Sequence, residues 1–164
     1  QPMTASYHHG AFKDVLQEIN AIAKKISKAH FEITRIKLEA MVSNRDIPME
    51  DMEAQKLPES NYFEFHIKVI LSAGDNLEML KKYCLQHDAH LSANAFKKLV
   101  DGKQQRFITM RVYGVGYKSA QQRFDNLLIL LKAKGFKLSQ QQREYAVYDS
   151  NLNLDTGWIN CGRE

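Results

Sequence analysis

Long apolar runs, a secretion signal and cysteines are absent or scarce in this sequence of 164 residues. No apolar stretch approaches the roughly 20 residues of a membrane-spanning helix, and no cationic segment followed by an apolar one opens the chain. Cys84 and Cys161 are the only two cysteines. Two cysteines in a chain of this length favour reduced thiols, and a single disulfide between them is the alternative. We therefore expect a cytoplasmic protein with no membrane partner.

Residues that interrupt helices and strands are also few, with three prolines and eight glycines. The composition of 44% hydrophobic and 26% charged residues is ordinary for a globular protein. At this length we expect one domain with a substantial core. The net charge of +4 is compatible with anionic ligands but too small to indicate nucleic-acid binding by itself.

The most informative stretch is Tyr62–Ser72, in which apolar and ionisable residues alternate. Successive side chains of a strand point to opposite faces of its sheet, so this strand is expected to have one apolar and one ionic face. Gln105–Gly114 has a similar alternation, and we expect the two strands to be neighbours. The first strand would place Phe63, Phe65, Ile67, Val69 and Leu71 under helices and leave Glu64, His66 and Lys68 on the other face.

Hydrophobic periodicity and turn signals predict the remaining elements. One helix is expected over 11–28. A second is expected over 76–87, after a capping box formed by Asp75 and Glu78, and a third runs from a capping box formed by Ser119 and Gln122 to Gly135. Strands are expected over 30–43, 89–100 and 144–149, the second turning at Asp101-Gly102. Residues 44–60 and 139–143 are predicted as loops, and the first is long enough to have a function.

From Tyr62 to Asp149 the expected order is the β-α-β-β-α-β series of ferredoxin-like folds. The predicted class is therefore α+β, with an antiparallel ferredoxin-like sheet, two helices on one face, and an additional N-terminal helix and strand. We expect a disordered or processed N-terminus at 1–10 and a single domain over 11–164. That domain would comprise a helix–strand extension (11–43), the loop 44–60, a ferredoxin-like core (61–150) and a C-terminal tail (151–164).

The ionic face of this sheet is the best candidate for a functional site. Its cations suit an anionic ligand, and an imidazole changes charge near neutral pH. We predict that His66 is a catalytic acid or base or a hydrogen-bond donor, with ligand-binding residues Lys68, Arg111, Thr109, Arg35, Lys37 and Glu64. The alternatives are a solvated face with cross-strand ion pairs and a homodimer interface.

Two segments of these strands, FHIKVI and FITMRV, resemble the strand motifs of two-histidine phosphoesterases, which carry His-x-Thr/Ser between apolar residues in each half. His66 matches the histidine of the first copy, and Thr109 matches the hydroxyl of the second. Lys68 stands where the first copy needs Thr or Ser, and Phe107 where the second needs His. The resemblance implies a phosphate-binding relative in which the family's reaction, opening cyclic phosphates with one histidine as base and the other as acid, would lack a partner.

Two further segments are weaker candidates. Gly114–Ser119 joins a strand to a helix start, where backbone N–H groups favour an anion, but a capped tight turn is the simpler interpretation. Asp149–Gly157 has alternate oxygen side chains like an EF-hand loop, yet Leu154 and Asn160 stand where that loop needs Gly and Glu. Asx-turns, with Trp158 docked on the domain, explain this segment better.

Cys84, His87 and His90 have a spacing that a metal could use, but no second pair completes a four-ligand site. We therefore predict no metal and no cofactor. The predicted function is binding, or binding and hydrolysis, of a phosphate-containing or other anionic small ligand on the open polar face. The first alternative is a non-catalytic protein-interaction or homodimerisation module. The second is an RNA-binding domain using Phe107 and Tyr113, and nucleic acid is the less favoured partner.

Overall fold

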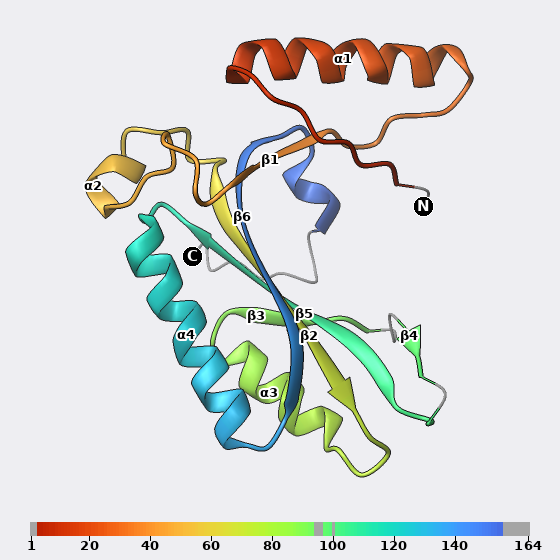
Figure 1. Cartoon of the computed structure of the whole chain (residues 1–164), viewed down its shortest axis with the longest axis vertical. Helices are drawn as coiled ribbons and strands as arrows, with labels where there is room; N and C mark the ends of the chain where they lie inside the picture. Colours follow the sequence, from red (N-terminus) through yellow and green to blue (C-terminus); the bar gives the residue numbers. More distant parts are fainter. Residues whose placement is uncertain (1–2, 94–96, 100, 156–164) are drawn as a thin grey trace.

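The computed structural model contains both helices and strands (Figure 1) and describes residues 3–93, 97–99 and 101–155. The elements in chain order are α1 (Phe12–Lys28), β1 (Lys37–Met41), α2 (Asp51–Ala54), β2 (Tyr62–Leu71), α3 (Leu77–Leu85), β3 (Ala89–Leu91), β4 (Lys97–Lys98), β5 (Gln104–Tyr113), α4 (Tyr117–Ala133), β6 (Lys137–Asp149) and the 3-10 helix η1 (Leu152–Asp155). The predicted α+β class is confirmed.

β2 is the middle strand of one antiparallel sheet with the order β1-β6-β2-β5-β3, and β4 also pairs with β5. β2 and β5 pair over their whole length, from Tyr62 opposite Tyr113 to Leu71 opposite Gln104. On its other side β2 pairs with β6. The two strands that the sequence predicted as neighbours are therefore adjacent at the centre of the sheet.

The hydrophobic core lies between one face of the sheet and the helices α3 and α4 (Figure 1). The alternating apolar residues of β2 are buried there, as expected. The ring of Phe65 stacks on that of Phe124 from α4, with centroids 4.6 Å apart. Cys84 of α3 is buried in the same cluster, and burial raises the pKa of its thiol to about 12. This cysteine is therefore a core residue and not a reactive thiol.

Three strands differ in length from the prediction. β6 begins at Lys137, so residues 139–143 belong to a strand and not to a loop. They were predicted as a loop because all five are polar. Gln140 and Gln142 lie opposite Lys68 and His66 of β2, where a half-exposed sheet accepts polar side chains. The strand predicted over 30–43 is shorter and covers only β1. The one predicted over 89–100 is divided into β3 and β4, with residues 94–96 and 100 outside the described part.

Loop 44–60 is folded against the N-terminus of α4. It contains α2, and its backbone oxygens at Pro48 and Met49 accept hydrogen bonds of 2.8 and 3.2 Å from the first two N–H groups of α4. Asp51 accepts another, of 2.8 Å, from the N–H of Gly116. These contacts satisfy donors that a helix start otherwise leaves unpaired. The loop therefore caps α4.

Both predicted capping boxes are wrong. The N-cap of α4 is Gly116, so Ser119 lies inside the helix. The N-cap of α3 is Asn76, whose side-chain oxygen accepts a 2.9 Å bond from the backbone N–H three residues later. The predicted end of α4 is confirmed, since Gly135 follows it with a φ of +82°, a conformation that favours glycine.

α1 confirms the helix predicted over 11–28 but contributes no residue to the core. Figure 1 shows it apart from the two helices that cover the sheet. Its aliphatic residues share one face and are half-buried, and no residue of the helix is fully buried. None of the helices in the described residues is long and apolar enough to cross a membrane.

Gly116→Ala tests the docking of loop 44–60 on α4. A Cβ at this position would lie 2.6 Å from the carbonyl oxygen of Met49 and 2.7 Å from the Cα of Glu50, both backbone atoms. We expect the substitution to lower the free energy of unfolding by about 2–3 kcal/mol, measured by chemical denaturation. Gly74→Ala is the control, because nothing lies within 4 Å of its added Cβ. Equal stability of the two variants would contradict the tight docking.

Candidate functional site

The face of the sheet opposite to α3 and α4, called the open face below, carries the polar side chains of the central strands. The structure brings to this face or its margin every residue of the predicted site: Glu64, His66 and Lys68 of β2, Thr109 and Arg111 of β5, Lys37 of β1, and Arg35 before β1. In cross-strand register Glu64 is opposite Arg111, and His66 is opposite Thr109. Residues from three strands and one adjoining segment are thus close together.

Glu64 lies at the centre of this face, buried and surrounded by positive charge. Its Oε1 accepts a 2.5 Å hydrogen bond from Arg111 Nε, and its Oε2 pairs with Lys37 Nζ. The same Oε2 lies 3.4 Å from Nε2 of His66. Burial favours a raised pKa, but His66, Lys37 and Arg111 outweigh it and hold the pKa of Glu64 far below its usual value. Glu64 is therefore ionised and held in place by its neighbours at neutral pH.

A second group of ion pairs surrounds Arg35. Its guanidinium binds Asp149 and donates a 2.7 Å hydrogen bond to Asp155. Asp155 also accepts a 2.7 Å bond from Arg111, so the two groups are connected. Burial lowers the pKa of Arg35, but the bonds to both carboxylates outweigh it and leave the pKa above its usual value. The cations predicted to bind an external anion at this end of the face are instead bound to carboxylates of the chain itself.

Negative charge exceeds positive charge in this network. The linked ion pairs among the described residues include five carboxylates (Glu39, Glu64, Glu144, Asp149, Asp155) and three permanent cations (Arg35, Lys37, Arg111), together with His66. With a neutral imidazole, two negative charges are uncompensated. Such a balance attracts a cation more than it attracts a free anion.

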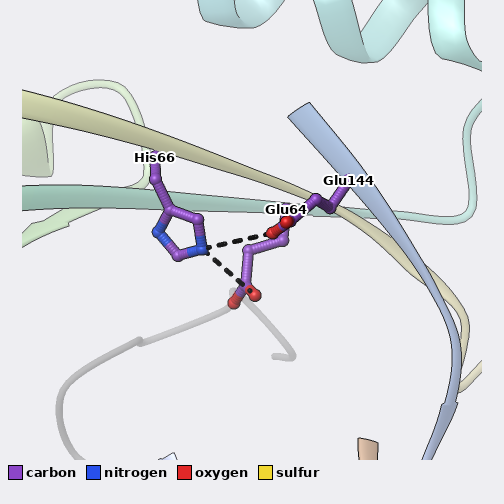
Figure 2. A group of neighbouring side chains, drawn as sticks. All are labelled: Glu64, His66 and Glu144. Atoms are coloured by element: carbon purple, nitrogen blue, oxygen red, sulfur yellow. Dashed lines mark ion pairs between the residues drawn. The ribbon is translucent and has the colours of Figure 1, made fainter. Parts of the chain in front are cut away.

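His66 faces two carboxylates with one ring nitrogen. Figure 2 shows its Nε2 directed at Glu64 and Glu144, at 3.4 and 3.8 Å. Its other nitrogen, Nδ1, lies 3.0 Å from the hydroxyl oxygen of Thr109, which fixes the orientation of the ring. One imidazole nitrogen and two carboxylate oxygens lie within 4.8 Å of one another, and Glu64–His66–Glu144 is the one such group of potential metal ligands found in the described part of the chain.

Glu144 carries the least compensated charge in this group. In the described structure its ion-pair partner is His66, at 3.8 Å, whereas Glu64 has Lys37 and Arg111 in addition. Burial raises the pKa of Glu144, and the nearby charge of Glu39 raises it further. The carboxylate is thus held half-buried beside other negative groups. A bound cation would relieve this repulsion.

The other half of the open face is less charged. Lys68 donates a 2.6 Å hydrogen bond to the Gln140 side chain, and its ammonium lies 5.5 Å from the centre of the Phe107 ring. His90 of β3 is opposite Thr109 in register, so Thr109 stands between two histidine positions. Burial lowers the pKa of His90, and Lys81 lowers it further.

The two weaker segments have structural partners of their own. The start of α4 is capped by loop 44–60: within Gly114–Ser119 the N–H groups of Tyr117 and Lys118 donate to backbone oxygens, and that of Gly116 donates to the Asp51 carboxylate. Asp149 accepts a 3.1 Å hydrogen bond from the N–H of Asn151, which is the expected Asx-turn. Trp158 lies outside the described residues. Cys84 is buried in the core and His90 lies on β3, so they belong to different elements.

Sequence reasoning missed the carboxylates that decide the charge of this face. Glu144 was predicted as the first residue of a strand but was not assigned to this face, because its pairing with Glu64 is long-range and has no local signal. Asp149 and Asp155 were assigned to turns, and their long-range pairing with Arg35 has no local signal. Neither a protein-family model, nor a curated protein, nor a solved structure matches this chain.

Glu64→Gln tests the importance of the buried carboxylate. Folding depresses the pKa of Glu64 below its ordinary value of 4.5. The ionised carboxylate therefore stabilises the fold fully when the pH is above 4.5, and this stabilisation is lost as the pH falls from 4.5 towards the depressed pKa. We expect the variant to be less stable by about 3 kcal/mol at pH 7. Below about pH 4.5 we expect the stability of the wild type to fall more steeply than that of the variant.

Denaturant unfolding at several pH values between 3 and 7 measures both effects. Glu32→Gln, at an exposed glutamate, is the matched control and is expected to have a stability within about 0.5 kcal/mol of the wild type at pH 7. Parallel stability curves for the wild type and Glu64→Gln across this range would show that Glu64 is not the stabilising carboxylate.

Proposed function

We propose that the protein binds a divalent metal ion through Glu64, His66 and Glu144 and, through that ion, a phosphate-containing or other anionic small ligand on the open face. The observation that carries the proposal is the position of the His66 Nε2 between two carboxylates of an acid-rich network. One imidazole and two carboxylates are a donor set suited to first-row ions such as Zn²⁺, Mn²⁺ or Fe²⁺.

The distances fit metal coordination better than direct hydrogen bonding. Hydrogen bonds from N–H to oxygen are normally about 2.7–3.2 Å long, whereas Nε2 of His66 lies 3.4 and 3.8 Å from the two carboxylates. Two ligands of a tetrahedral ion with bonds of about 2.1 Å are about 3.4 Å apart. A small closing movement of Glu144 would therefore complete a three-ligand site.

Thr109 supports the ring in both states of this site. A hydroxyl both donates and accepts hydrogen bonds, so Thr109 can donate to Nδ1 when Nε2 carries the proton and can accept from Nδ1 when Nε2 binds a metal. Groups that orient a metal-bound histidine in this way raise metal affinity. In this proposal His66 is a metal ligand and Thr109 is its positioning residue.

The ion supplies the positive charge that an anionic ligand needs. Arg35, Lys37 and Arg111 are neutralised by carboxylates, and the network is negative without an ion. A site with three protein ligands leaves coordination positions for water or for a phosphate oxygen. A bound Zn²⁺ would also activate water as a nucleophile near neutral pH, so the same arrangement would support hydrolysis of a phosphate ester. The negative network disfavours the RNA alternative, because it repels a phosphate backbone.

The strand order supports a finer description of the fold within this proposal. The core from β2 to β6 has two helices on one face and the order β6-β2-β5-β3. We propose that it is a ferredoxin-like unit, extended by α1 and β1 at its N-terminus. The metal ligands then come from two neighbouring strands of that unit, β2 and β6.

Titration calorimetry of the whole chain with Mn²⁺ and Zn²⁺ at pH 7 tests the metal site. We expect one equivalent to bind, and we expect His66→Ala and Glu144→Gln each to weaken binding at least about tenfold, because each removes a ligand. His90→Ala is the matched control on the same face and is expected to change the affinity less than about threefold. Absence of saturable binding, or full affinity in both ligand variants, would overturn the proposal.

Inorganic phosphate is the probe for the anionic ligand. We expect it to bind the Mn²⁺-loaded protein and not the metal-free protein, because the metal-free face is negative. Calorimetric titrations of phosphate with and without bound Mn²⁺ measure the difference. Equal binding in both titrations would show that the ion does not recruit the anion.

A further inference from the structure

We infer that Lys37 determines the ion specificity of this site, because its ammonium group occupies the Glu64 oxygen that a metal ion would need. This inference rests on the proposed metal site and adds a residue that is not a ligand. Lys37 Nζ pairs with Oε2 of Glu64, the same oxygen that lies 3.4 Å from Nε2 of His66. The ammonium and a metal ion would therefore compete for one atom.

The fold holds Lys37 in this position. β1 and β2 are not neighbours, since β6 lies between them. On β6, Lys37 pairs with Asp149 and Glu64 with Glu144, and Ala146, opposite Glu39 and Tyr62, is a small residue between these two positions. The ammonium lies 5.3 Å from the centre of the Tyr62 ring, and the side chain is only 19% exposed. Lys37 is thus a fixed part of the network and not a solvated lysine.

A metal ion and the ammonium cannot both remain at Glu64. An ion bonded to Oε2 at about 2.1 Å would lie within about 5 Å of Nζ, where two positive groups repel each other strongly in a half-buried site. Lys37 has a second partner, Glu39, which is on the same strand and is more exposed. We therefore expect the ammonium to move onto Glu39 alone when the metal binds.

Displacement of a resident cation selects the ions that bind. An alkali ion carries the same single charge as the Lys37 ammonium that it would displace, so the exchange would gain little binding free energy. Mg²⁺ prefers oxygen ligands and retains its water, so it gains little from the imidazole of His66. A first-row transition ion gains both the higher charge and the bond to Nε2, and this gain is larger for Zn²⁺ than for Mn²⁺. Lys37 thus raises the threshold for binding and favours this second class.

Lys37→Met tests the inference by removing the charge while keeping an unbranched side chain. We expect its affinity for Mn²⁺ to increase at least about tenfold. In calorimetry we expect Mg²⁺ to bind measurably to the variant but not to the wild type. Lys37→Arg, which keeps the charge, is expected to behave like the wild type. Lys68→Met removes a lysine from the same face at a distance from Glu64 and is expected to change the Mn²⁺ affinity less than about threefold.

Amine labelling of the wild type, followed by mass spectrometry, tests the same inference without a substitution. We expect Mn²⁺ to increase the labelling of Lys37 and to leave that of Lys68 unchanged. Unchanged labelling of Lys37 in the loaded protein, or unchanged Mn²⁺ affinity in Lys37→Met, would overturn the role of Lys37. Loss of metal binding in His66→Ala would still support the site in that case, whereas full binding in His66→Ala and Glu144→Gln would overturn the site itself.

Discussion

A negative charge buried on the central strand of the sheet is the constraint on which the open face depends. Glu64 is placed there by the alternation of β2, and an uncompensated carboxylate at such a position is strongly unfavourable. Arg111 from β5 and Lys37 from β1 compensate it, so strands on both sides of β2 contribute to one ion network. Asp155 then joins Arg111 to Arg35, which ties η1 and the segment before β1 to the same face. The network fixes the N-terminal strand and the C-terminal 3-10 helix relative to the sheet.

The two faces of β2 stabilise the protein by different means. On the helix-covered face, non-directional burial of apolar side chains favours folding but specifies position loosely. On the open face, ion pairs between named partners require a defined register, because a slip by one residue would move Glu64 into the core. The apolar face therefore accounts for most of the driving force, and the ionic face accounts for the alignment of β1, β6, β2 and β5 around Glu64.

The part of this structure that could be predicted from sequence is the part encoded by short-range patterns. The alternation of Tyr62–Ser72 and Gln105–Gly114 identified the central pair, and the helical spacing of residues 11–28 and the glycine at 135 located α1 and the end of α4. The strand β6 was found only in part, since its first half is polar on both faces. Loop 44–60 was identified as long, but its docking on Gly116 depends on a tertiary contact that has no local signature.

The candidate site shows the same limit in chemical terms. Sequence alternation placed His66, Lys37 and Arg111 on one face. It suggested an anion site because only the charged residues of two or three strands could be assigned to that face from the sequence. The sign of a site depends on all the charges around it, and here Glu144, Asp149 and Asp155 enter from elements whose pairing is long-range. Once they are included, the cations are internal partners and the surplus is negative. In the proposed site an anion binds through an added cation, and the His66 ring, directed at two carboxylates, and the ammonium of Lys37 would decide which cation that is.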